Sequence, residues 1–357
     1  YKYYESIIQY LLSHSNVVIH YITSDPNDAI FQKAIEQSRI KPYYIGEKRL
    51  ITLMMKMDAD IVVMTMPDLD NYHIKRSYVK KDIEYIFMFH GPLSMHMAMR
   101  NGCVDHFDTI FSVGPHTTAE VRKIEEIYHL PAKTIVECGY GLLEKLRAEY
   151  LQYAQQAIVH NNIKVLIAPS WQPGNIMEGA LKPMLESLKN SPWEICVRPH
   201  PQYVKHFLAQ LKELEMQYSD YPNITFQADF SNNRSIFEAD VLVSDWSGIA
   251  YEFAFATQKP VLFINTPMKV MNPEYKKIGI EPLEITLRNH VGISIDLKDL
   301  NKSKEAIQSL LSSQSQYSGH IEMLRKKYFY NFGQSGEIGA KYILKALTSE
   351  KGNQSNK

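Results

Sequence analysis

The chain of 357 residues has no net charge, because 39 basic side chains balance 39 acidic ones. This balance argues against a nucleic-acid-binding protein that relies on a basic field, so any site for an anion has to be local. No segment approaches the roughly 18 to 20 apolar residues that a membrane-spanning helix needs. We therefore expect a cytoplasmic protein whose only contact with a membrane is peripheral, on its inner face.

Cysteine is scarce as well. Cys103, Cys138 and Cys196 show no CxxC spacing, and their number is odd. In a chain without a secretory signal, this usage indicates reduced thiols in a cytoplasmic compartment. We expect the three side chains to be buried packing residues.

Common nucleotide and metal motifs are missing too. Neither Gly-x-Gly-x-x-Gly nor Gly-x-x-x-x-Gly-Lys-Ser/Thr occurs, so a nicotinamide site or a Walker-type phosphate loop has no support. No group of His, Cys, Asp or Glu has zinc spacing, and no Asp-x-Asp is placed to chelate a metal between phosphates. The sequence thus favours chemistry without a metal or a cofactor.

Apolar strand-like runs alternate with amphipathic helical runs along the chain, which is typical of parallel sheets covered by helices. The expected strands cover residues 17–22, 43–45, 61–64, 85–89, 109–113 and 135–138, and then 164–168, 194–197, 224–227, 240–243, 261–264 and 292–295. A helix over 142–159 and a polar joint at 160–162 separate the two series.

This pattern predicts an α/β protein with two Rossmann-like domains facing a cleft, as in glycosyltransferase-B enzymes or two-domain binding proteins. The first, acceptor-side domain covers residues 1–160, and its opening strand is expected upstream because Tyr1 already lies in a helical pattern. The second, nucleotide-donor domain covers residues 161–335. Residues 336–357 form a helix, expected to pack back on the first domain, and a polar tail.

Two neighbouring strand ends carry the most informative chemistry. The strand at 195–197 runs into RPHP (residues 198–201), and the strand at 241–243 runs into SDWSG (residues 244–248) before a helix. Ligands of parallel α/β sheets bind outside the carboxyl ends of strands, so both segments are expected at one ligand. Ser247 and Gly248 stand where backbone N–H groups and the helix dipole favour a phosphate. The plainer alternatives are a stiff proline turn and an N-cap.

A histidine ends the run at 85–89. His90 is followed by Gly91, and a histidine at a strand end can act as the base that deprotonates an alcohol. Alternatively, it caps the turn or satisfies a backbone carbonyl. His200 with Arg198 would bind or protonate the leaving phosphate. His96 and His106 are at helical positions without partner spacing, and we expect both to be structural.

Weaker candidates complete the site. Ser170 follows the first strand of the second domain, whereas Glu252 and Asp229 offer carboxylates to a ribose or an alcohol; each also fits an ordinary loop or capping residue. The expected catalytic residues are His90 and His200, and the expected donor-binding residues are Arg198, Ser170, Ser244, Asp245, Ser247, Gly248, Glu252 and Asp229.

Together, His90-Gly91, RPHP, SDWSG and the late NFGQSG (residues 331–336) resemble the CDP-glycerol glycerophosphotransferases, which include teichoic acid primases and polymerases. The similarity covers about residues 83–347. It implies a glycosyltransferase-B fold and transfer of glycerol phosphate, or a related alditol phosphate, from a CDP-linked donor to a hydroxyl of a lipid-linked or polysaccharide acceptor. By this resemblance His90 is the base, His200 the partner of the donor phosphate, and Ser247 with Gly248 the phosphate cradle.

The chain also departs from the family pattern. The family usually has Ser-Asp-Tyr-Ser-Ser where this chain has Trp246 and Gly248. Glycerol, ribitol and sugar phosphate donors stay open, as does a capsule in place of a teichoic acid. Two other functions are also open: a glycosyltransferase or epimerase that uses a UDP-sugar, and a non-catalytic nucleotide-binding module.

Overall fold

The computed structural model describes residues 1–156 and 162–354, and the chain forms two compact units. The first unit consists of Tyr1–Glu144, Met271–Ile280 and Lys327–Lys357, and the second of Lys145–Val270 and Glu281–Lys326. The division falls earlier than the expected 160/161, inside helix α6 (Gly141–Gln155). Residues 157–161, which include most of the expected joint, lie outside the described residues, as do residues 355–357 of the expected tail.

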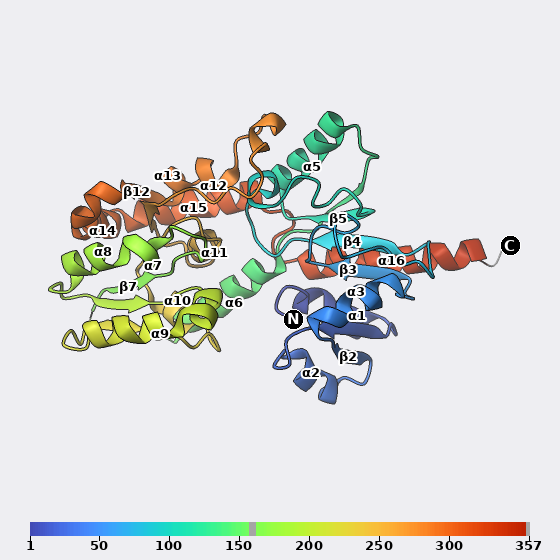
Figure 1. The fold of residues 1–357 in the computed structure, drawn as a ribbon, viewed down its shortest axis with the longest axis horizontal. Coiled ribbons are helices and arrows are strands. Elements are labelled where there is room, and N and C mark those ends of the chain that lie inside the picture. The colour runs from blue at the N-terminus through green and yellow to red at the C-terminus, as the bar shows by residue number, and fades with distance from the viewer. Residues whose placement is uncertain (157–161, 355–357) are drawn as a thin grey trace. The chain divides into compact units, whose positions relative to one another are not determined.

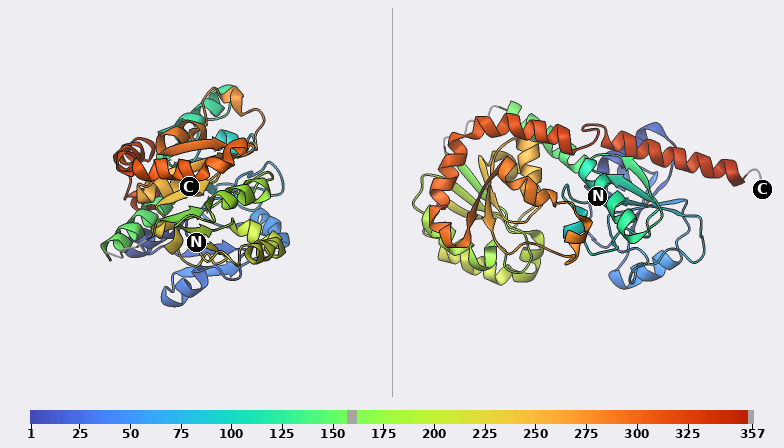
Figure 2. Two further views of the ribbon diagram at one scale, coloured as in Figure 1. Left: turned by 90° about the vertical axis from the view of Figure 1, so that its left-hand side faces the viewer. Right: turned by 90° about the horizontal axis from the view of Figure 1, so that it is seen from above.

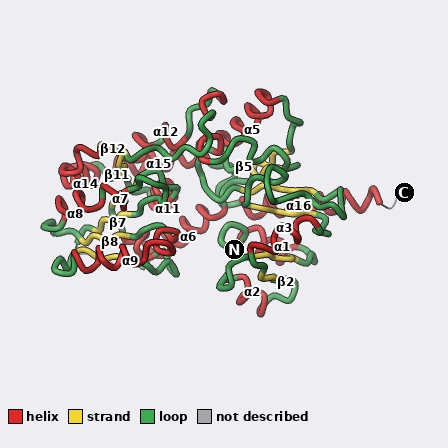
Figure 3. Tube along the Cα trace, viewed as in Figure 1, coloured by secondary structure: helices red, strands yellow, loops and turns green. Residues whose placement is uncertain are grey.

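All twelve expected strands are confirmed, with ends shifted by a few residues. They are β1 Ile19–Thr23, β2 Ile40–Tyr44, β3 Ile61–Met64, β4 Glu84–Met88, β5 Thr109–Ser112, β6 Thr134–Glu137, β7 Lys164–Ile167, β8 Glu194–Val197, β9 Ile224–Phe226, β10 Val241–Ser244, β11 Val261–Asn265 and β12 Gly292–Asp296. Helices separate most of them, as Figure 3 shows.

The first unit carries α1 Glu5–His14, α2 Ile30–Glu36, α3 Glu47–Met55, α4 Met95–Ala98, α5 Pro115–Tyr128, η1 Tyr275–Ile278 and α16 Ser335–Gln354. The second carries α7 Ile176–Gly179, α8 Leu181–Leu188, α9 Pro201–Gln217, α10 Arg234–Glu238, α11 Ile249–Thr257, α12 Leu283–Thr286, α13 Arg288–Val291, η2 Leu297–Lys302, α14 Ser303–Ser312 and α15 Gln314–Tyr328. Within the described residues, no helix is both long and apolar enough to cross a bilayer.

The strands of the first unit form two parallel sheets. Strands β3 to β6 pair in sequence order, whereas β1 pairs only with β2. Helix α16 packs along α1, and both contribute to one apolar cluster that includes Ile7, Ile86 and Ile343 (Figure 1). A Cβ at Gly339 of α16 would lie 2.9 Å from Cδ1 of Ile7, so glycine permits this close approach. Strands β3 and β4 pair in parallel, so their carboxyl ends lie side by side.

The second unit is a six-stranded parallel sheet with the order β12-β11-β10-β7-β8-β9. One face of the sheet, with Leu262 and Ile264, packs in a cluster with α8 and α14, while Phe263 of the other face contacts Tyr251 of α11. Helices therefore cover both faces, and Figure 2 shows this sandwich edge-on. The strand order is that of a Rossmann sheet, in which β8 and β9 are added on one side of β7 and the later strands, from β10 on, are added on its other side. Such a switch point opens a crevice at the carboxyl ends of β7 and β10.

Candidate active site

The switch point between β7 and β10 brings two predicted segments together. Strand β7 pairs with β10, with Ile167 opposite Val243. Ser170 follows β7 and SDWSG begins at the last residue of β10, so both lie at the edge where a Rossmann sheet binds its ligand. Strand β8, which pairs with β7 on its other side, delivers RPHP to the same edge. The predicted convergence of the three segments is therefore supported by the topology.

Asp245 ties two of these segments to each other. Its side chain is fully buried, and its carboxylate accepts hydrogen bonds from the amides of Ser170 (2.8 Å) and Ile176 (3.2 Å). Ser244, also fully buried, donates from Oγ to the carbonyl of Ala168 (2.6 Å). Burial raises the pKa of Asp245, whereas the amide donors oppose that rise. These contacts make Ser244 and Asp245 positioning groups for the two loops.

Helix α11 begins at Ile249, with Gly248 as its N-cap residue, as the sequence predicted. The amides of Ala250 and Tyr251 donate to the carbonyls of Ser247 and Gly248 in the first turn. Within the described chain, the amides of Ser247, Gly248 and Ile249 have no acceptor. These three N–H groups, rather than those deeper in the helix, are the donors that the loop can offer to a phosphate.

Arg198 and His200 lie one residue apart after β8. Arg198 is half-buried and donates to Oγ of Ser235 (2.8 Å) and to the carbonyl of Asn232 (3.3 Å), and burial lowers its pKa. His200 is the N-cap of α9, where its Nδ1 accepts from the amide of Gln202 (3.1 Å). An imidazole that accepts at Nδ1 carries its proton at Nε2. His200 is therefore built as a hydrogen-bond donor.

His90 has the opposite arrangement. It follows β4 in the first unit, its side chain is exposed, and its Nδ1 lies 3.2 Å from the carbonyl of Thr65. Thr65 follows β3, the strand that pairs with β4. A carbonyl can only accept, so Nδ1 carries the proton and Nε2 carries the lone pair. The alternative interpretation, in which His90 satisfies a backbone carbonyl, is thus correct for Nδ1, and the same contact prepares Nε2 as a base.

The two weaker carboxylates lie in different surroundings. Asp229 is exposed and accepts from the amide and the hydroxyl of Ser231, both at 2.8 Å, and these hydrogen bonds lower its pKa. It therefore has the contacts of a turn-forming carboxylate. Glu252 is half-buried in the first turn of α11. A contact of either residue with a ribose stays a prediction.

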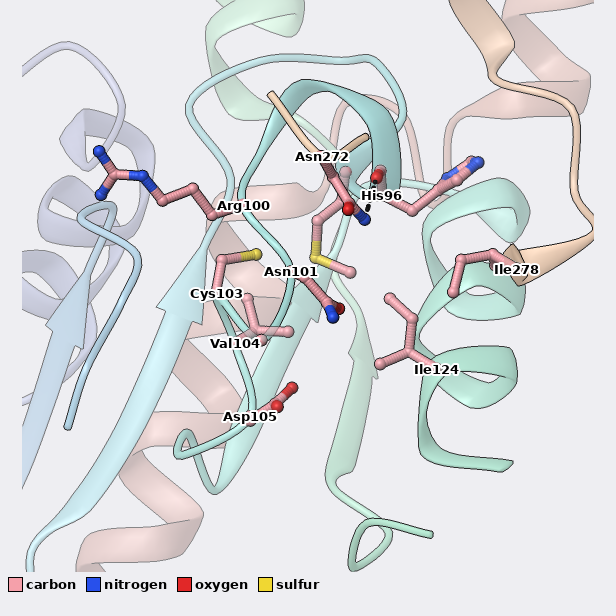
Figure 4. Close-up of a pocket in the computed structure, with 11 residues that line it drawn as sticks. His96, Arg100, Asn101, Cys103, Val104, Asp105, Ile124, Asn272 and Ile278 are labelled. Atoms are coloured by element: carbon pink, nitrogen blue, oxygen red, sulfur yellow. Dashed lines mark hydrogen bonds between the residues drawn. The ribbon is translucent and has the colours of Figure 1, made fainter. Parts of the chain in front are cut away.

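His96 and His106 differ from the two candidate catalytic histidines. His96 is buried, with Nε2 2.9 Å from the carbonyl of Ile280 and Nδ1 3.2 Å from the carboxylate of Glu120. Figure 4 shows its neighbour Asn272, whose amide donates to the carbonyl of His96 (3.0 Å). The pocket beside them has a volume of about 10 Å³, room for roughly one water. His96 is structural, as expected, and His106 is exposed.

The chain has two Asp-x-Asp sequences, and in these Asp60 pairs with Lys80 and Asp68 with Arg100. Among residues 1–156 and 162–354, no three His, Cys, Asp or Glu side chains are grouped to hold a metal ion. All three cysteines are free thiols; Cys103 and Cys138 are buried as expected, while Cys196 is only partly buried.

Two residues near the donor segments were not predicted from the sequence. Trp171 is 51% exposed and its ring stacks on His200 at a centroid distance of 6.1 Å. In this loop only Ser170 was predicted, although a tryptophan that follows a Rossmann strand can stack on a flat ligand. The second is Arg288 of α13, which contacts the carbonyl of Asp245 (3.1 Å). No spacing in the sequence links Arg288 to the loop at 244–248.

Comparison with known proteins identifies the family of the chain. A sequence model of the family described as CDP-glycerol:poly(glycerophosphate) glycerophosphotransferase matches residues 4–272. The match begins earlier than the resemblance over 83–347 and ends before the motif at 331–336. Among curated proteins none matches the chain.

Solved structures show the same fold. A variant of the wall teichoic acid polymerase TagF has a TM-score of 0.62 at 15% identity, covering 97% of this chain and 85% of that one. Another variant of this polymerase, soaked with CDPG, has a TM-score of 0.61 at 14% identity over the same shares of the two chains. Sucrose-phosphate synthase from Thermosynechococcus elongatus has a TM-score of 0.53 at 13% identity, covering 97% of this chain and 92% of that one. The predicted glycosyltransferase-B fold is confirmed.

Proposed function

Because the chain belongs to the CDP-glycerol:poly(glycerophosphate) glycerophosphotransferase family, and is thus an enzyme that transfers glycerol phosphate from CDP-glycerol, we propose that His90 is the general base of this transfer. One observation carries the proposal: Nδ1 of His90 faces the carbonyl of Thr65 at 3.2 Å, which leaves the lone pair on Nε2. A base of this kind takes the proton of an acceptor hydroxyl as the hydroxyl attacks.

The proposed reaction is a single displacement at phosphorus. The acceptor oxygen attacks the phosphorus that carries glycerol, its proton passes to Nε2 of His90, and the bond to the phosphate of CMP breaks. The acceptor gains glycerol phosphate, and CMP leaves with the electron pair of the broken bond. Nε2–H of His200 and the guanidinium of Arg198 are suited to meet the charge of the leaving phosphate. We propose that both histidines act in this one transfer reaction.

The donor diphosphate is proposed to lie at the start of α11. The amides of Ser247, Gly248 and Ile249 supply donors there, and the helix dipole adds a positive partial charge. Ser170 and Glu252 line the same strand edge and, with Asp229, are proposed to contact the ribose or the glycerol. Since hydrogen-bond donors and cationic side chains meet the phosphate charge in this arrangement, the proposal needs no divalent metal.

We propose that the acceptor is a growing cell-wall polymer that is lipid-linked, which would bring the enzyme to the inner face of the membrane as a peripheral protein. A lipid-linked acceptor has its reactive hydroxyl at the end of a long polar chain. A soluble synthetic acceptor that carries a few glycerol phosphate residues on a short lipid therefore suits the assay. Comparing turnover with and without lipid vesicles tests the membrane contact.

A donor screen tests the function. Purified protein is mixed with CDP-glycerol, CDP-ribitol or UDP-glucose, and both CMP or UDP release and protection against thermal unfolding are measured. We expect protection and acceptor-dependent CMP release with CDP-glycerol, unchanged by EDTA. Protection and turnover with UDP-glucose alone would contradict the donor assignment. Protection without any turnover would indicate a binding module, and loss of activity in EDTA would contradict metal independence.

A further inference from the structure

Arg288 is a buried cation in the second unit. It is the first residue of α13 and is only 5% exposed. Its guanidinium carbon lies 4.1 Å from the centroid of the Trp246 ring and 4.5 Å from that of Phe263. The guanidinium therefore contacts two aromatic rings, one from the SDWSG loop and one from β11. Arginine favours such stacked positions because its charge is delocalised over a plane.

The N–H groups of Arg288 join the ends of two strands. Nη1 donates to the carbonyl of Asp245 (3.1 Å), just after β10, and Nη2 donates to Oδ1 of Asn265 (2.9 Å) and, at 3.4 Å, to the carbonyl of Ile264. On the same loop, Nε1 of Trp246 donates to the carbonyl of Thr266 (2.9 Å). Arg288 and Trp246 thus fasten the SDWSG loop to the carboxyl end of β11.

The buried carboxylate of Asp245 attracts the charge of Arg288 without pairing with it directly. Its hydrogen-bond partners are two carbonyls and one amide oxygen, and it has no ion pair within the described ranges 1–156 and 162–354. Burial lowers its pKa, yet a guanidinium stays protonated at any physiological pH. Buried charges without a direct ion pair are costly, and proteins retain them where they act on a ligand or a partner charge. An anion bound to the neighbouring amides would add a second attractive negative charge beside Asp245.

We propose that Arg288 is a positioning residue for the donor diphosphate: it fixes the SDWSG loop and places a buried positive charge in the wall that carries the phosphate cradle. This inference rests on the proposed donor site at Ser247 and Gly248. It also gives a physical role to Trp246, one of the two departures from the family pattern. The indole supplies both a flat face for the guanidinium and an N–H for Thr266.

A matched control lies at the carboxyl end of α11, the helix that follows the SDWSG loop. Arg147 is a half-buried guanidinium that donates to the carbonyl of Ala256 (2.8 Å) and to Oε1 of Gln258 (3.1 Å), at the carboxyl end of α11. Burial lowers its pKa as well. Arg288→Met and Arg147→Met therefore each remove one guanidinium. The first contacts the loop before α11, and the second contacts the carboxyl end of α11. Only the first should change donor binding.

The test measures the dissociation constant of CDP-glycerol by calorimetry, and KM and kcat by CMP release. We expect Arg288→Met to weaken donor binding on the order of tenfold to a hundredfold, with kcat at saturating donor within a few-fold of wild type. Arg288→Lys keeps the charge but not the planar fork, so an intermediate loss is expected. Arg147→Met should bind CDP-glycerol as the wild type does, even if its melting temperature falls equally.

Other outcomes decide against the inference. Donor binding by Arg288→Met within threefold of wild type, or an equal loss in Arg147→Met, would overturn it. If Arg288→Met does not fold, Arg288→Lys and Trp246→Phe carry the test, and unchanged donor affinity in both would overturn it. Wild-type protein that binds CDP-glycerol but shows no transfer would refute the proposed function while leaving the role of Arg288 intact. Absence of CDP-glycerol binding by the wild type would overturn both.

Discussion

Replacing His90 with glutamine tests the proposed base most directly. Glutamine can still donate to the carbonyl of Thr65 through its amide, but it cannot take a proton from the acceptor hydroxyl. A positioned base contributes roughly 10² to 10⁴ in rate. With about 1.4 kcal/mol for each factor of ten, the barrier should rise by roughly 2.8 to 5.6 kcal/mol. We therefore expect kcat to fall by that factor while the affinity for CDP-glycerol stays within a few-fold.

The effect on folding should be much smaller than the effect on catalysis. His90 is exposed, and it donates a hydrogen bond to the backbone carbonyl of Thr65. Even complete loss of such a bond changes the free energy of unfolding by only about 1 kcal/mol. Circular dichroism melts of wild type and His90→Gln separate a folding defect from a catalytic one. A large fall in the melting temperature would show that His90 is mainly structural.

The assay follows acceptor-dependent CMP release under single-turnover conditions with saturating donor. His106→Gln is the matched control, because His106 is also an exposed histidine of the first unit. It should react at the wild-type rate. Turnover by His90→Gln within threefold of wild type would refute the assignment of the base. A parallel loss of donor affinity would instead place His90 in donor binding.

Three further predictions concern the donor site and stability. Ser247→Ala removes one hydroxyl near the proposed phosphate, and Gly248→Val adds bulk at a residue whose φ of −59° tolerates valine. Calorimetry should show donor binding weakened roughly tenfold to a hundredfold in both variants, with and without EDTA. Unchanged affinity in both would place the diphosphate elsewhere. His200→Phe loses Nε2–H and should lower kcat for CMP release by at least about tenfold, whereas a near-normal kcat would exclude a role at the leaving phosphate. Burial lowers the pKa of His116 in the folded protein. As the pH falls from about 6.5 toward this lower pKa, only the unfolded state gains the proton, so the free energy of unfolding decreases in this window. His116→Gln, which can still donate to the carbonyl of Pro92, should flatten this dependence in chemical denaturation between pH 7 and 5; equal slopes would contradict the cause.

Most strands could be predicted because they are short apolar runs bounded by polar residues, although β1 (IHYIT) and β2 (IKPYY) contain polar residues or proline. β3 and β8 have the predicted bounds, since burial on both faces of a parallel sheet selects continuous apolar sequence. The unit boundary could not be predicted in this way. Segment 271–280 rejoins the first unit through contacts such as the amide of Met271 with the carbonyl of Met97 (2.9 Å), which is 174 residues earlier by numbering (271 − 97). Local sequence contains no record of that pairing.

The candidate site divides in the same way. His90, His200 and the SDWSG loop are predictions from the sequence, because each lies at or just after the carboxyl end of a strand. The ends of β8 and β10 share one edge of the second unit's sheet, whereas β4 belongs to a sheet of the first unit. The tertiary structure decided the state of His90, because the carbonyl of Thr65 sets its proton on Nδ1. The state of His200 follows from a local N-cap contact, because the amide of Gln202 sets its proton on Nε2. A side chain's tautomer follows from the atom it faces.

Arg288 marks the limit of the sequence most clearly. It lies 43 positions after Asp245 (288 − 245), in a helix of four residues with no motif around it. Only folding places its guanidinium between the rings of Trp246 and Phe263. The sequence by itself determined the strands, their class of sheet and the residues at their ends, because these follow from local polarity and short-range order. Which charges lie beside those ends was decided by tertiary packing, because a buried contact joins residues that no spacing relates.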